Sequence, residues 1–102
     1  MGRWAQRKRT GGSPSPPLNQ LLSATITGAA TAEATYANPL DGAGFTPGDF
    51  QSSPSNETGT SIANVSANVI EVTFSGAIAG DVDFDFLGSR DGFVSPNSVA
   101  YT

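Results

Sequence analysis

Apolar and polar residues alternate along much of the chain after residue 18, which is typical of strands with one buried face. The clearest examples are residues 69–74 (VIEVTF) and residues 81–87 (DVDFDFL). In the second segment we expect the apolar side chains to point inward and the three aspartates to point outward. Those apolar side chains are Val82, Phe84 and Phe86.

Weaker alternation predicts further strands over residues 18–27, 31–37, 61–65 and 99–101. In the first of these, Leu22, Ala24 and Ile26 share the apolar face. Residues 52–60 are polar and indicate an exposed loop or hairpin tip. About seven short strands joined by turns are typical of an antiparallel β-sandwich, and no helix is required.

The chain has 102 residues, of which 37% are hydrophobic, and it lacks runs of strong helix formers. This length predicts one domain. We assign residues 18–102 to the β-sandwich domain and residues 11–17 (GGSPSPP) to a linker, because glycine gives a flexible joint and proline favours an extended chain. We expect residues 1–10 to form an extended basic N-terminal arm.

Charge is divided unequally between the arm and the domain. Four of the five cations lie in residues 1–10, whereas residues 18–102 contain Arg90 and all nine acids, a net charge of −8. The arm is therefore expected to attract acidic partners, while the domain repels nucleic acid.

The arm contains the only tryptophan of the chain, Trp4, between basic residues. We expect Trp4 to fill a pocket on a neighbouring protein while cations pair around it. Stacking of Trp4 on a nucleic-acid base and a plain solubilising tail remain alternatives. The predicted partner-binding residues are Arg3, Trp4, Arg7, Lys8 and Arg9.

The absence of Cys and His from the sequence removes the usual zinc ligands, the Cys nucleophile and the Ser-His-Asp triad. We therefore predict that the protein is not an enzyme and needs no cofactor. No stretch approaches the roughly eighteen apolar residues of a membrane span, and the basic N-terminus lacks the apolar segment of a signal peptide. We accordingly expect no membrane association.

The only acidic cluster is Asp81, Asp83 and Asp85, which could offer oxygen ligands to Ca²⁺. Strand alternation explains the same pattern as a solvated face. The resemblance to a calcium-binding helix–loop–helix loop fails, because Phe86 and Gly92 stand where that loop requires Gly and Glu. We prefer the interpretation without a metal and retain the three aspartates as a weak candidate site.

Four segments carry a resemblance to a known family: FTPGDF at residues 45–50, IANV at residues 62–65, VIEVTFSGAIAGDVDFDF at residues 69–86 and VAYT at residues 99–102. They resemble the immunoglobulin-like repeats of bacterial surface and adhesion proteins, including the cyanobacterial swimming-motility type. The resemblance covers about the last sixty residues and implies an immunoglobulin-like sandwich rather than a function. The chain departs from the family in having one copy, no export signal and the basic arm.

A single immunoglobulin-like module on a basic arm is similar to accessory proteins of phage particles, such as decoration and head–tail joining proteins. We therefore expect a structural protein of the virion whose arm contacts other structural proteins, with self-association possible. A carbohydrate- or cell-surface-binding adhesion module is the first alternative, and nucleic-acid binding through the arm is the second. We expect the protein in the virion if the resemblance holds. Otherwise we expect it in the cytoplasm or at a cell surface reached by a non-classical route.

Overall fold

The computed structural model describes residues 18–40 and 44–102. This part of the chain is all-β, with seven strands and one short 3₁₀ helix, η2 (Pro47–Asp49). The strands are β1 (Leu21–Ile26), β2 (Thr31–Tyr36), β3 (Phe50–Ser53), β4 (Glu57–Ser66), β5 (Val69–Phe74), β6 (Asp83–Phe86) and β7 (Asn97–Ala100). The predicted all-β class and the approximate number of strands are confirmed.

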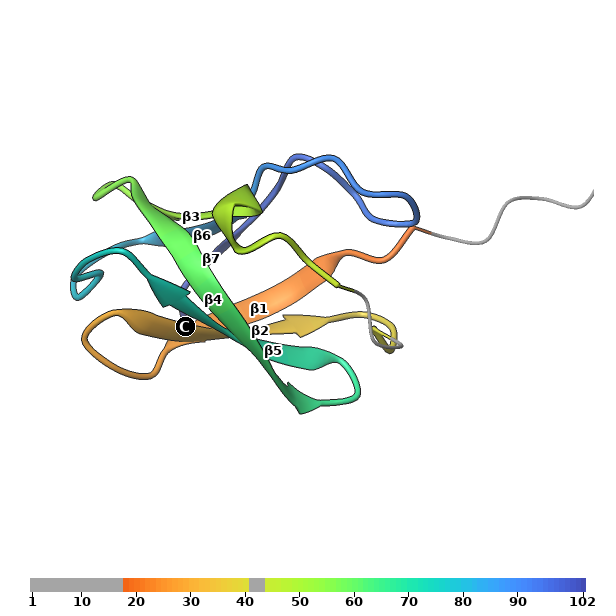
Figure 1. The fold of residues 1–102 in the computed structure, drawn as a ribbon, viewed down its shortest axis with the longest axis horizontal. Coiled ribbons are helices and arrows are strands. Elements are labelled where there is room, and N and C mark those ends of the chain that lie inside the picture. Colours follow the sequence, from red (N-terminus) through yellow and green to blue (C-terminus); the bar gives the residue numbers. More distant parts are fainter. Residues whose placement is uncertain (1–17, 41–43) are drawn as a thin grey trace, which may run out of the picture.

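The seven strands form one sheet in the order β1-β2-β5-β4-β3-β6-β7, and every paired ladder is antiparallel. The two ends of this order meet, because Ala24 on β1 makes a parallel bridge with Tyr101 just after β7. The Thr102 amide donates to the Ala24 carbonyl at 2.9 Å. A second bridge joins Asn19 to Phe93. The sheet is therefore nearly closed on itself (Figure 1).

The core lies between two halves of this sheet. One half contributes the buried residues of β2 and β5, and the other contributes those of β3 and β6. Phe84 connects the halves: its ring is edge-on to Phe74 at 6.1 Å between centroids, and it packs against Phe50 at 5.4 Å. Each fully buried aromatic ring stabilises the fold by about 2–3 kcal/mol. Aromatic burial is therefore what holds the halves together.

Small side chains on β2 leave room for these rings. Ala32 and Ala34 are fully buried, and they alternate with Glu33 and Thr35 as the sequence predicted. Alanine is a weak strand former, so propensity alone does not explain β2. β2 is instead stabilised by its position between β1 and β5, because it pairs with a strand on each side.

Two details of the sequence prediction are wrong. Leu22 was expected inside but is 57% exposed, because the β1–β2 register shifts between Leu21 and Ser23 and Leu22 has no partner there. Val82 was also expected inside but is 59% exposed, because β6 begins only at Asp83. Phe84 and Phe86 are buried as predicted.

The polar segment 52–60 was predicted to be an exposed loop or hairpin tip, and the hairpin tip is confirmed. It holds the end of β3, a tight turn and the start of β4. Asn56 has a φ of 64° in this turn, a left-handed conformation that asparagine tolerates better than most residues. Because only residues 54–56 separate the strands, the polar residues on either side are in extended conformation.

β4 is shared between the two halves of the sheet. Its first two residues pair with β3, whereas Gly59 to Ser66 pair with β5 alone. η2 lies over the point of divergence, where a Cβ on Gly59 would overlap the Pro47 carbonyl oxygen. Figure 1 shows β4 crossing the front of the fold diagonally, away from β3.

The outer face of the sheet carries an unfavourable pair, since Glu33 on β2 lies directly opposite Glu71 on β5. Like charges at such positions destabilise a sheet, and opposite charges stabilise it. We predict that Glu33→Lys raises the free energy of unfolding by roughly 1 kcal/mol at low salt. Thermal unfolding would show a rise in Tm of several degrees. The gain should shrink at high salt, and no gain at low salt would contradict the assignment of this pair.

Candidate functional site

The predicted partner-binding residues of the arm, Arg3, Trp4, Arg7, Lys8 and Arg9, lie outside the described residues. The described residues show the surface of the domain. Three features of it bear on function: the aspartates around β6, an aromatic end that contains Arg90, and the free edge of β4.

Asp81 precedes β6 and accepts three hydrogen bonds. The hydroxyl of Ser52 and that of Ser55 each donate to its Oδ2 atom at 2.5 Å, and the Ser55 amide donates to Oδ1 at 3.1 Å. Desolvation raises the pKa of Asp81, but the hydrogen bonds from Ser52 and Ser55 outweigh it and hold the pKa below its usual range. The carboxylate is therefore a fixed anion that ties the segment before β6 to β3 and the turn after it.

Tyr101 extends this network. Its hydroxyl lies 2.8 Å from the Ser52 Oγ atom, and because Ser52 donates its only proton to Asp81, Tyr101 must be the donor. Desolvation raises the pKa of Tyr101, as do the nearby aspartate charges, so its hydroxyl keeps the proton at neutral pH. Ser52 is fully buried. The chain from Tyr101 through Ser52 to Asp81 therefore links β7, β3 and β6.

Asp85 was expected to face solvent, but it is only 8% exposed. Its strand, β6, lies between β3 and β7, and a serine from each neighbour donates to it. The Ser53 hydroxyl reaches Oδ2 and the Ser98 hydroxyl reaches Oδ1, both at 2.6 Å. Buried charges need such partners. Asp85 is thus buried on the face opposite Phe84 and Phe86, because hydroxyl donors on both sides satisfy its carboxylate.

These contacts define what the aspartates can do chemically. Oxygens of Asp81 and Asp85 already accept short hydrogen bonds from serine hydroxyls. Within residues 18–40 and 44–102, no three His, Cys, Asp or Glu side chains gather closely enough to hold a metal ion. In this arrangement Asp81 and Asp85 fasten strands together, and Asp83 is the partly exposed member between them.

Aromatic rings fill the end of the domain where the described chain begins. Phe45 stacks on Tyr36 at 5.6 Å and meets Phe93 edge-on at 5.1 Å between centroids. The Arg90 guanidinium lies over both Phe rings, 5.1 Å from the centroid of Phe45 and 5.7 Å from that of Phe93. It also donates to the Gly44 carbonyl at 3.0 Å. Arg90 therefore joins the segment after β2, which contains Gly44 and Phe45, to the segment before β7, which contains Phe93.

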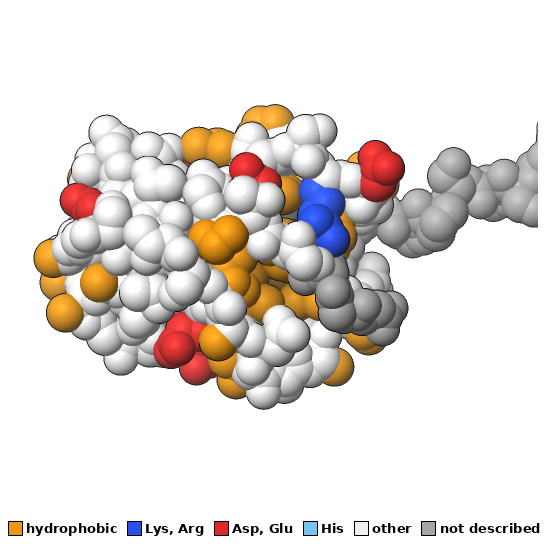
Figure 2. All heavy atoms as spheres, in the orientation of Figure 1, with side chains coloured by type: hydrophobic (Ala, Val, Ile, Leu, Met, Phe, Trp, Pro, Cys, Tyr) orange, Lys and Arg blue, Asp and Glu red, His pale blue; other side chains and the backbone are white. Residues whose placement is uncertain are grey.

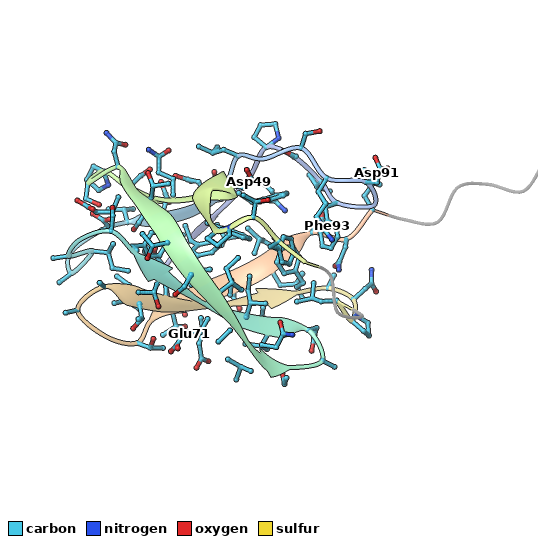
Figure 3. All side chains as sticks on the ribbon, viewed as in Figure 1. Asp49, Glu71, Asp91 and Phe93 are labelled. Carbon is cyan, nitrogen blue, oxygen red and sulfur yellow. The ribbon has the colours of Figure 1, made fainter. Side chains whose placement is uncertain are left out.

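This end keeps two buried donors without an acceptor in the described part of the chain, the Tyr36 hydroxyl and the Arg90 Nε atom. Burial raises the pKa of Tyr36 far above its usual range, and the Arg90 charge offsets this only in part. Figure 2 shows apolar side chains in a recess beside the blue guanidinium, and Figure 3 places Phe93 and Asp91 at the same end. Tyr36 itself is fully buried.

The free edge of β4, defined here as residues 60–66 (TSIANVS), is the third feature. Every residue in it is exposed except Ile62, which packs partly against the core. It contains no charge and no proline, and from residue 58 to residue 70 the chain is uncharged. Natural sheet edges are usually protected by charges, prolines or pairing. β4 has only two register shifts, at Gly59/Ser61 and at Asn64/Ser66.

Comparisons with protein-family models, with curated proteins and with solved structures found no match to this chain. In the described residues, no helix has both the length and the apolar character needed to cross a membrane.

Sequence reasoning missed two parts of this surface. The free edge was hidden because residues 57–60 look like a polar loop, although the uncharged run from residue 58 to residue 70 was a readable signal. The position of Arg90 was also missed. It is the single cation among nine acids of the domain, and it lies three residues before Phe93, which could have indicated a contact with rings.

The lowered pKa of Asp81 makes stability depend on pH. Because folding favours the ionised form, Asp81 contributes stability above its ordinary pKa of 3.8, and this contribution is lost as pH falls through the lower pKa of the folded state. We predict that Asp81→Asn flattens the acid limb of the stability profile below that pH. Urea unfolding at a series of pH values measures this, with Asp83→Asn as the control. Equal acid limbs for wild type and Asp81→Asn would contradict the hydrogen-bond assignment.

Proposed function

We propose that this chain is a non-enzymatic structural or assembly module, an immunoglobulin-like domain that docks on a larger protein assembly through its basic arm. The observation that carries the proposal is the division of charge: four cations in residues 1–10 against a net −8 in residues 18–102. The only cation of the domain, Arg90, is committed to Phe45, Phe93 and the Gly44 carbonyl. Residues 1–10 therefore carry all of the chain's other positive side chains.

The strand order supports the immunoglobulin-like part of the proposal. Constant-type immunoglobulin domains have strands A, B, E and D in one sheet and C, F and G in the other. With strands lettered in chain order, the order here is A-B-E-D followed by C-F-G. The C–D pairing of two residues and the G–A bridge then join the two layers at their margins.

Protein is a better partner for the arm than nucleic acid. Nucleic-acid binding would bring a phosphate backbone close to a domain of net charge −8, and this repulsion opposes the attraction of the arm. A protein surface offers acidic groups and a pocket for Trp4 together, and buried Trp and Arg are the residues that most often dominate protein interfaces. Assemblies such as a phage particle, which the sequence resemblance suggests, provide such surfaces in repeated form.

Amide hydrogen exchange of residues 1–17 tests this function. The purified chain at low concentration and the assembled fraction of its native source are compared. We expect exchange in these residues to slow by at least about tenfold on assembly, because docking orders the arm. A variant with Arg3, Arg7, Lys8 and Arg9 all changed to Gln keeps the linker and should lose the protection. Equal exchange of the arm in both states would show that it is a passive tail.

A further inference from the structure

The free edge of β4 has a shape and a chemistry that fit the arm itself. From Gly59 to Ser66 the strand pairs with β5 only, so its other side presents backbone donors and acceptors to whatever lies beside it. We propose that this edge, residues 60–66, accepts residues 4–10 of a second copy of the chain as an added antiparallel strand, with Arg7 beside Ala63. This inference rests on the proposed function, because it treats the arm as the docking element.

The two faces of β4 suit the alternation of the arm. In an extended chain, Arg3, Arg7 and Arg9 point to one face and Trp4 and Lys8 to the other. The two segments have the same length, and neither contains proline. Backbone pairing can therefore run along the whole edge, which is the main source of affinity when a peptide adds a strand to a sheet.

The outer face of the edge leads to acidic side chains. Ala63 on β4 lies opposite Glu71 on β5, which in turn lies opposite Glu33 on β2. Figure 3 shows Glu71 on the outside of the sheet, pointing away from the core. A strand added to β4 would lie about 10 Å from β5. An arginine side chain spans most of that distance. The guanidinium groups of the outward arginines can therefore come closer to the Glu71 carboxylate than one Debye length, about 8 Å, so salt screens their attraction only in part.

The inner face of the edge offers an apolar contact instead. Ile62 lies opposite the buried Val72 and is only partly covered by the core. With Arg7 beside Ala63, Lys8 lies beside Ile62, and the methylene groups of its side chain can cover the isoleucine while its ammonium group stays in water. Outward arginines and the apolar part of Lys8 thus meet the two chemistries that β4 presents, acidic outside and apolar inside.

A second copy fits better than the same molecule. The described chain begins at the end of the fold where β4 finishes, since the Leu40 amide bonds the Ala67 carbonyl and the Ala37 amide bonds the Gln20 carbonyl. Antiparallel docking within one molecule would require Thr10 to lie beside Thr60, about 20 Å from that end. Residues 10–17 span at most about 25 Å. The linker would be almost fully stretched, whereas a second molecule meets no such restraint.

Sedimentation velocity of the full-length chain over a concentration series tests the proposal. Wild type should self-associate, and the association should weaken between about 20 mM and about 500 mM NaCl because ion pairs contribute to it. Ala63→Lys should lower the association constant at least about tenfold, because it places a like charge against the arm. The new lysine lies opposite Glu71, so folding is retained, and a melting temperature at or above that of wild type verifies this.

Thr25→Lys is the matched control. Thr25 is exposed on β1 and lies opposite Glu33, so this variant makes the same charge change in the same cross-strand setting, away from β4. It should associate like wild type. The double arm variant Arg7→Gln/Arg9→Gln should be as impaired as Ala63→Lys.

Three other outcomes overturn the proposal. Association that is lost in Ala63→Lys but kept in the arm variant would mean that two β4 edges pair with each other. A monomer at all concentrations, with residues 61–66 protected from exchange in wild type but not in the arm variant, would mean docking within one molecule. A monomer without such protection would mean that the edge is not the receptor. In that last case, arm protection in the assembled fraction would still leave the proposed function standing.

Discussion

The structure depends on an unequal pairing between two neighbouring strands. β3 has four residues and β4 has ten, so β3 can pair only with the residues of β4 that follow the turn, Glu57 and Thr58. The remainder of β4 must follow β5, and the sheet opens between the two halves at that point. Every other junction is paired, including the one between the first and last strands, where Ala24 meets Tyr101. One mismatch in length therefore decides where the nearly closed sheet has an open edge.

The acidic character of the domain has two different physical origins. Asp81 and Asp85 are fastened to serine hydroxyls and hold β3, β6 and β7 in register. Glu33 and Glu71 have the opposite relation, since they lie side by side on the outer face and repel each other. The first pair stabilises the fold, whereas the second leaves a local excess of negative charge. A basic segment that approaches the outer face relieves that repulsion. The pair that destabilises the sheet would therefore favour docking of the arm.

The sequence predicted the parts of the fold that follow from simple alternation. β5 begins and ends at the predicted residues, and Phe84 and Phe86 are buried as expected. Alternation failed where a neighbouring strand changes the environment: Asp85 is buried because serines on both sides satisfy it, and Leu22 is exposed because of a shift in register. Of the candidate site, the basic segment of residues 1–10 follows from composition alone, and its role in docking stays a prediction. For the free edge, the uncharged run from residue 58 to residue 70 was a sequence signal, but the position of the edge depends on the difference in length between β3 and β4, which only the three-dimensional pairing reveals.

The open edge is the central claim of this account, and proton–proton contacts measured by NMR on the dilute, monomeric chain test it most directly. The account predicts short contacts across the Ala24–Tyr101 closure and between Gln51 and Thr58, and none from residues 61–66 to β3. Contacts between residues 61–66 and β3, or no contact between Ala24 and Tyr101, would contradict it, because the sheet would then be open at a different place.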